Sequence, residues 1–386
     1  MQVKANLGHF MCASAGRSVK GKGDDTYACR NLGGLALAVV SDGASIIDTQ
    51  GHARELKSAW LSASIVSGLE RIVEDLTRYT QHEVLYEDVM LALHAIDNVM
   101  EGYIDLYSPC RKCGSGFSVF LTKLLSVFRG SSKAVVSAAT LAAVIMHPSW
   151  VITVKAGDSH ALLHFVPYFP SDYSEEKWRR LLSSLLAGTV MPLPAFGEEA
   201  LAVLRASLGG RRIVLASNYL AAPASILTEG AFYAAHRSGY SCLVGVVASD
   251  GIELVEGLYT LTLSPLREPQ GPQGKPASTI TLAPRKSGGF QELLETLKVL
   301  DKKLVKGLMT GINSLLYTVP DKILQLNLSH IVALAACYAL QNGDSSALEE
   351  LLKHIVESGY SDEYDDASIA VVVGEIRVEG KGSDKR

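Results

Sequence analysis

The sequence has no apolar run long enough to cross a membrane. Its longest runs, residues 138–146 and 331–340, are much shorter than the ~20 apolar residues that a spanning helix needs. The first ten residues contain no basic stretch that leads into an apolar segment, so no secretory signal is predicted. We therefore expect a cytoplasmic protein with no membrane partner.

An excess of basic residues is also missing. The 386 residues include 36 Lys and Arg against 40 Asp and Glu, which gives a formal net charge of −4. General nucleic-acid binding requires clustered cations that displace counterions from the phosphates. The composition therefore predicts no nucleic-acid partner, and it leaves the oligomeric state open.

The six cysteines are scattered along the chain and indicate little about function. Only Cys110 and Cys113 have the spacing of metal ligands. No second cysteine pair or histidine motif completes the four ligands that a structural zinc ion needs. The simpler interpretation is a loop disulfide or two free thiols.

Apolar residues make up 48% of the chain and charged residues 20%, which is enough for a substantial core. Short apolar segments bounded by Gly, Pro or Asp predict strands at residues 35–41, 140–146, 151–156, 161–166, 212–217, 242–249 and 368–373. Helical spacing of apolar residues covers 51–76, 83–103, 175–186 and several pieces of 290–357, broken at Gly311, Pro320 and Asn342. Strands grouped between helical blocks predict an α+β fold in layers rather than a doubly wound parallel sheet.

Acidic residues recur where the predicted strands begin or end. They are Asp24 and Asp25, Asp42, Asp158, and Asp365 and Asp366. Carboxylates that converge at strand ends repel one another unless hard cations neutralise them, and a ligand set of oxygens alone suits Mg²⁺ or Mn²⁺. Two such ions can share a water, lower its pKa and clamp a phosphoryl group for in-line attack. Single Asp-Gly pairs are common in turns, so it is the ordered set that indicates this chemistry.

Three segments resemble, in order, motifs of the protein phosphatase 2C (PPM-type) family. The first is GKGDDTYACRNLGGLALAVVSDGAS, with an acidic pair, a strand, and a second strand that ends in Asp-Gly. The second is SAATLAAVIMHPSWVITVKAGDSHALL, and the third is the closing strand YDDASIAVVVGE. Together they cover nearly the whole chain, and the segment after Asp42 resembles the divergent prokaryotic branch of the family.

The resemblance implies an α+β fold, a four-layer α/β/β/α sandwich of two antiparallel sheets flanked by helix pairs. Residues 1–386 would form one phosphatase-like domain. The region from about 259 to 340 exceeds what the compact family domain needs and would be an insertion. The polar tail at 379–386 is expected to be frayed.

The activity implied by the resemblance is hydrolysis of phosphoserine or phosphothreonine in a phosphorylated protein substrate, with two or three Mn²⁺ or Mg²⁺ ions. Asp42 would bridge two of the ions. Asp24, where the family usually has Glu, would ligate one of them together with the Gly43 carbonyl. Asp365 would ligate the other.

Further roles carry over from the same motifs. Asp158 would help to hold a third, weaker ion. Lys20 lies where the family often has a phosphate-binding arginine, and it offers a point charge but no bidentate fork. Asp25 and Asp366 would shape the site as neighbours of the primary ligands.

One expected acidic position has two candidates. The predicted strand 212–217 is followed by Asn218 where the family has a third Asp-Gly, and Asp250-Gly251 is the other possibility. We favour Asn218, because residues 223–236 predict the helix that follows this motif, whereas Asp250 lies between two apolar segments that predict a hairpin. An amide at this position removes one negative charge and weakens metal binding. The alternative function is therefore a phosphatase-like regulatory or binding module with little or no activity.

Overall fold

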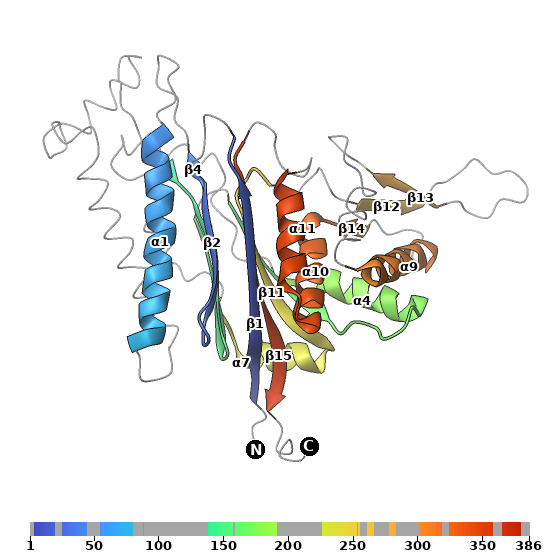
Figure 1. Ribbon diagram of the computed structural model, residues 1–386. Helices are drawn as coiled ribbons and strands as arrows, with labels where there is room; N and C mark the ends of the chain where they lie inside the picture. The colour runs from blue at the N-terminus through green and yellow to red at the C-terminus, as the bar shows by residue number, and fades with distance from the viewer. Residues whose placement is uncertain are drawn as a thin grey trace, which may run out of the picture.

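The computed structural model describes residues 4–19, 25–44, 55–79, 88, 138–156, 159–190, 226–252, 254, 261–265, 278–282, 301–318, 324–357 and 365–379. These residues form two five-stranded antiparallel sheets packed face to face, with helices on the outer side of each sheet (Figure 1). The α+β sandwich predicted from the sequence is confirmed.

The first sheet, sheet A, pairs the first described strand with the last. Its order is β1 (Lys4–Arg17), β15 (Ala367–Glu379), β11 (Tyr240–Ala248), β8 (His160–Pro167) and β9 (Thr189–Val190). The β1–β15 pairing runs from Lys4 opposite Glu379 to Arg17 opposite Ala367. We did not predict β1 from the sequence, because many of its side chains are only partly buried and a bulge at His9 interrupts its alternation.

The second sheet, sheet B, contains the strands that the sequence predicts most clearly. Its order is β10 (Ile226–Thr228), β7 (Trp150–Ala156), β6 (Leu141–His147), β3 (Ala36–Ser41) and β2 (Thr26–Asn31). Two smaller sheets are β4 (Gly43–Ala44) with β5 (Ala138–Ala139), and β13 (Ser278–Leu282), β12 (Leu261–Pro265) and β14 (Leu324–Leu326). The predicted strand 212–217 lies outside the described residues.

Alternate side chains of the central strands enter different cores. In β3, Ala38 and Val40 pack between the two sheets, whereas Leu37 and Val39 pack beneath the helix outside sheet B. Successive side chains of a strand point to opposite faces. A strand whose two faces are both covered therefore reads as a continuous apolar run, which is why these strands could be predicted.

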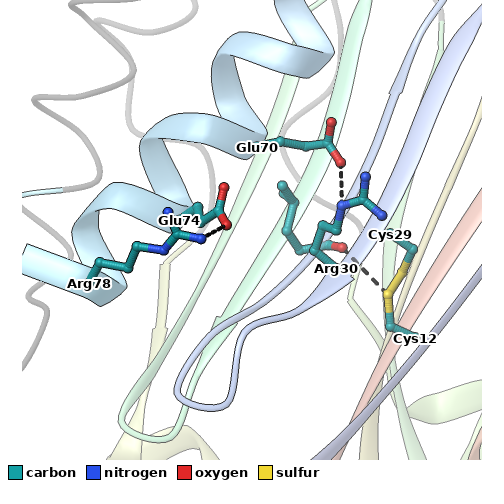
Figure 2. A network of polar contacts seen from close by, with 7 residues as sticks. Cys12, Cys29, Arg30, Glu70, Glu74 and Arg78 are labelled. Carbon is teal, nitrogen blue, oxygen red and sulfur yellow. Dashed lines mark hydrogen bonds and ion pairs between the residues drawn. A yellow bond between two sulfur atoms is a disulfide. The ribbon is translucent and has the colours of Figure 1, made fainter.

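Helix α1 (Glu55–Tyr79) covers the outer face of sheet B and confirms the helix predicted at 51–76. Its buried side chains Ile65, Leu69 and Val73 follow the spacing of one helical face. An ion pair between Arg30 Nε and Glu70 Oε1, 2.7 Å apart, joins β2 to this helix (Figure 2). The second helix predicted here, 83–103, lies almost entirely outside the described residues.

Among the described residues, the helices that pack on the outer face of sheet A are α4 (Glu175–Ala187), α10 (Leu328–Asn342) and α11 (Ser345–Glu357). Helix α9 (Lys302–Thr318) packs on α4 and extends the same core outward (Figure 1). The break predicted at Gly311 is wrong, because α9 continues through it. A Cβ at Gly311 would lie 2.9 Å from the Trp178 carbonyl oxygen, so the glycine permits close packing of α9 on α4.

Two further predictions near β11 need correction. The helix predicted at 223–236 begins only at Glu229, as α7 (Glu229–Arg237), because β10 before it pairs with β7. The hairpin predicted at Asp250-Gly251 is not formed. Strand β11 is already paired with β15 on one side and β8 on the other, so the segment after it has no free edge to join.

Four cysteines form two disulfides that the sequence did not predict. Cys12 of β1 is bonded to Cys29 of β2, which links the two sheets (Figure 2), and Cys242 of β11 is bonded to Cys337 of α10. The partners are 17 and 95 positions apart, so no local motif reveals them. Cys110 and Cys113 lie outside the described residues.

No helix in the described part of the chain is both long and apolar enough to cross a membrane. Structural disulfides are typical of oxidising compartments and of intracellular proteins from hyperthermophiles. The cytoplasmic location expected from the sequence therefore stays a prediction.

Two buried histidines face each other where α10 lies on sheet A. The His164 and His330 ring centroids are 5.1 Å apart. Burial lowers the pKa of His164 to about 3, with the neighbouring His330 adding to the shift, and burial lowers the pKa of His330 to about 4. His330 also completes the capping box at the start of α10, where its Nδ1 accepts the Asn327 N–H.

We expect His330→Gln to reduce the acid sensitivity of the fold. A histidine with a lowered folded pKa stabilises the native state above its unfolded value near 6.5, and this contribution is lost as the pH falls from there toward about 4. At pH 5 the loss is about 2 kcal/mol for this side chain. Glutamine does not titrate and can keep the capping box.

Urea unfolding at pH 7.5 and pH 5 tests this expectation. The variant should match the wild type at pH 7.5 and be the more stable protein at pH 5. An identical loss of stability in both proteins between the two pH values would contradict it.

Candidate functional site

Acidic residues gather at one end of the sandwich because of the strand registers. In sheet B, Thr26 pairs with Ser41, which places Asp25 before β2 next to Asp42 after β3. In sheet A, Ala248 pairs with Ile369, which places the residues after β11 beside those that open β15. Antiparallel neighbours thus bring one strand's start to another strand's end.

The centre of this group is a set of three carboxyl groups, Asp25, Asp42 and Asp250. The Asp42 side chain is hydrogen-bonded to both Asp25 and Asp250. Burial raises the pKa of Asp42 well above its usual value, and the charges of Asp25 and Asp250 raise it further. Carboxyl groups in direct contact repel one another when all of them are ionised. They therefore share a proton or bind a cation. We call this set the carboxyl cluster.

Asp25 is the best supported member of the carboxyl cluster. The Ser368 hydroxyl donates to its Oδ2 over 2.8 Å, and the Ser249 side chain forms a second hydrogen bond to it. Burial raises the pKa of Asp25, while hydrogen bonds from Asp42, Ser249 and Ser368 act in the opposite direction. Asp25 and Asp42 therefore form a contact in which one of the two carboxyl groups has to carry a proton when no cation is bound.

The residues that open β15 are held by the end of β1. The Val19 N–H donates to Asp366 Oδ1 over 2.6 Å, and Arg17 Nη2 donates to the Asp365 carbonyl oxygen over 3.3 Å. Asp366 is only 4% exposed, and its charge contributes to the raised pKa of Asp25. The Asp365 carboxylate accepts the backbone N–H of Asp366. Pairing of β1 with β15 thus fixes this part of the site.

Gly251 allows the turn after β11 to lie against β15. A Cβ at this position would lie 2.0 Å from the Asp366 carbonyl oxygen, a distance that no side chain tolerates. The turn can therefore bring Asp250 to Asp42 only with glycine after it. This is the role that sequence reasoning missed when it assigned Asp250-Gly251 to a hairpin.

The backbone of Asp42 is fixed by Thr140. The Asp42 N–H donates to Thr140 Oγ1 over 3.0 Å, and the Thr140 N–H donates to the Asp42 carbonyl over 2.8 Å. The Ser41 hydroxyl donates to the Thr140 carbonyl over 2.6 Å, and the Thr140 hydroxyl contacts the Ser159 hydroxyl. The buried carboxyl group therefore projects from a backbone with its hydrogen bonds satisfied.

Only part of the site predicted from the sequence falls within the described residues. Asp42, Gly43 and Asp365 do, and all three lie at strand ends on this side of the sandwich, with Gly43 in β4 paired to Ala139. Four other predicted residues lie outside the described part of the chain: Lys20, Asp24, Asp158 and Asn218. Their roles stay predictions.

The donors in the carboxyl cluster are of the type that Mg²⁺ and Mn²⁺ prefer. A cation would also relieve the repulsion that raises the pKa of Asp42. Within the described ranges, however, no group of three or more His, Cys, Asp or Glu side chains is arranged to hold a metal ion. The chemistry of the donors therefore fits a cation, while in this structure the carboxyl groups contact one another directly.

No family model matches the chain, and no curated protein matches its sequence. Several solved structures are similar over most of the chain. The catalytic domain of the serine threonine protein phosphatase PstP, in complex with 2 manganese ions, is 12% identical with a TM-score of 0.36, covering 96% of this chain and 99% of that one. A bacterial serine phosphatase is 10% identical with a TM-score of 0.35, covering 96% and 100%.

PppA, a regulatory component of T6SS in Pseudomonas aeruginosa, is 14% identical with a TM-score of 0.35, covering 96% of this chain and 99% of that one. TM-scores below 0.5 at these identities do not establish a family for this chain.

We expect Asp42→Asn to stabilise the metal-free protein. The raised pKa of the Asp42 carboxyl means that its contribution to stability is complete below about pH 4 and is lost as the pH rises through the folded value. Asparagine keeps the shape without this penalty. At pH 8 in EDTA the variant should therefore be more stable than the wild type.

The control for this prediction is Asp172→Asn. Asp172 is exposed and pairs with Lys177 over 2.7 Å, so its replacement should leave stability unchanged or slightly lower. Urea unfolding at pH 4.5 and pH 8 measures both variants. An Asp42→Asn protein that is less stable than the wild type at pH 8 would show that burial of this charge is not the constraint we describe.

Proposed function

We propose that this protein is a divalent-cation-dependent phosphomonoesterase that hydrolyses phosphoserine or phosphothreonine in protein substrates. The observation that supports this most directly is the carboxyl cluster of Asp25, Asp42 and Asp250. Buried acidic groups that contact one another lower the stability of a fold unless a positive charge joins them. A binding site for hard cations gives this arrangement a function.

Asp42 is the residue we assign to bridge two cations, because its carboxyl group lies between Asp25 and Asp250. Asp250 then takes the third acidic position that we first gave to Asn218. The end of β11 brings Asp250 to the cluster, and its carboxylate supplies a full negative charge where an amide would supply none. The other ligands proposed from the sequence are Asp24, Asp158, Asp365 and the Gly43 carbonyl.

The cations, Mn²⁺ or Mg²⁺, would lower the pKa of a shared water and neutralise charge on the phosphoryl group. The chain's own residues orient the ligands around them. Thr140 fixes the Asp42 backbone by accepting its N–H. Lys20, if it lies where the sequence motif suggests, would attract the phosphate as a point charge.

The second candidate function is a phosphatase-like regulatory or binding module. It is favoured by the direct contact between the carboxyl groups, which a shared proton can stabilise without any metal. Such a module would bind phosphorylated proteins or signalling partners without hydrolysis. Metal dependence and turnover separate the two functions.

We expect Mn²⁺-dependent hydrolysis of p-nitrophenyl phosphate, with loss of at least 100-fold in Asp42→Asn. The substitution removes the bridging charge and preserves the shape of the side chain. EDTA should abolish the activity, and the exposed-site variant Asp172→Asn should retain it. Hydrolysis that survives both EDTA and Asp42→Asn would exclude the metal mechanism. Full metal binding without hydrolysis would favour the regulatory module.

A second experiment decides between Asp250 and Asn218. Asp250→Asn should weaken Mn²⁺ binding by at least 10-fold, because it removes one charge from the cluster, and Asn218→Asp should leave the affinity unchanged. Calorimetric titration of both variants with Mn²⁺ gives the comparison. Tighter binding in Asn218→Asp, together with unchanged binding in Asp250→Asn, would restore the assignment made from the sequence.

A further inference from the structure

Two buried serines connect sheet A to the carboxyl cluster. Ser249 follows β11 and Ser368 lies in β15, and both are fully buried. The Ser249 N–H donates to the Ser368 carbonyl over 3.0 Å, and the Ser368 N–H donates to Ser249 Oγ over 3.0 Å. These two reciprocal hydrogen bonds hold the serines together, and neither of them uses a hydroxyl proton.

Both hydroxyl groups are hydrogen-bonded to the same carboxylate. Ser368 Oγ donates to Asp25 Oδ2 over 2.8 Å, and the Ser249 side chain is also hydrogen-bonded to Asp25. Asp25 belongs to sheet B, because it immediately precedes β2, whereas both serines belong to sheet A. The contacts are thus a polar bridge between the sheets, made at the point where the carboxyl cluster lies.

The two serine hydroxyl groups are enough to hold the Asp25 carboxylate in one orientation. A carboxylate has two oxygens, and each serine has one hydroxyl proton to donate. With both hydroxyl groups hydrogen-bonded to Asp25, the carboxylate is held by two donors while it contacts Asp42. An unsupported aspartate at this position would rotate about its side-chain bonds and lose that contact.

We propose that Ser249 and Ser368 are positioning residues that orient the Asp25 carboxylate toward Asp42 for cation binding. This inference rests on the proposed function, because it assigns the serines a part in preparing the cation site. Neither serine touches the substrate or a cation in this role. Hydrogen-bonded supports of this kind commonly change metal affinity by 10–100-fold.

A double-mutant cycle with Ser368→Ala and Asp25→Ala tests the proposal. In the wild-type protein, Ser368→Ala should weaken Mn²⁺ binding at least fivefold, as measured by calorimetry. In the Asp25→Ala background the same substitution should have no effect on Mn²⁺ affinity. Ser368→Thr keeps the hydroxyl group and should restore most of the affinity lost in Ser368→Ala.

The matched control is Ser241→Ala. Ser241 is a buried serine at the other end of β11, and it donates to the Val166 and Pro167 carbonyl groups rather than to an acidic residue. Its replacement should lower the unfolding midpoint, as Ser368→Ala does, but leave Mn²⁺ affinity unchanged. If Ser241→Ala weakens Mn²⁺ binding as much as Ser368→Ala does, the effect is a general structural one and the proposal is overturned.

The same cycle measured by urea unfolding in EDTA separates this inference from the proposed function. The coupling between Ser368 and Asp25 should persist in EDTA. Ser368→Ala should lower the free energy of unfolding less in the Asp25→Ala protein than in the wild type. Coupling without any Mn²⁺ binding in the wild type would refute the cation site while confirming the serine–aspartate bridge. Additive effects in both measurements would refute the positioning role itself.

Discussion

Burial of both faces of both sheets is the constraint on which the rest of this structure depends. The two sheets cover each other on their inner sides, and helices cover their outer sides. A central strand such as β3 therefore has no face on which a charged side chain could lie at low cost. Polar chemistry is confined to the strand ends, and there the registers of the two sheets bring Asp25, Asp42 and Asp250 together.

The carboxyl cluster opposes this constraint locally. Its acidic groups lie against one another, and Asp25 and Asp42 are partly buried, so the surrounding hydrogen bonds must compensate for lost hydration. Thr140 satisfies the Asp42 backbone, and Ser368 supports the Asp25 carboxylate. Binding and catalytic sites often contain residues that lower the stability of the fold but are held in a defined geometry. The bound ligand then supplies the favourable interaction that these residues lack without it.

The sequence was sufficient to predict the doubly buried strands, the amphipathic helices and the position of Asp42. It was not sufficient where pairing partners lie far apart. The Asp-Gly pair at Asp250 is a strong local hairpin signal, and it was overridden because β11 lies between two strands from distant parts of the chain. Strand β1 has only weak alternation, and its place depends on β15. The Cys12–Cys29 disulfide likewise joins different sheets, so its pairing follows from the tertiary fold.

The pairing of β1 with β15 has a consequence for biosynthesis. β1 is the edge strand of sheet A, and among the described strands of that sheet β15 is its single neighbour. Val19 and Asp366, which are hydrogen-bonded in the finished protein, are 347 positions apart. At about 5–20 residues per second, a ribosome needs roughly 20–70 s to cover that distance. During this time β1 has an exposed hydrogen-bonding edge, and a nascent chain that carries Asp25 and Asp42 still lacks the Ser368 hydroxyl that supports Asp25.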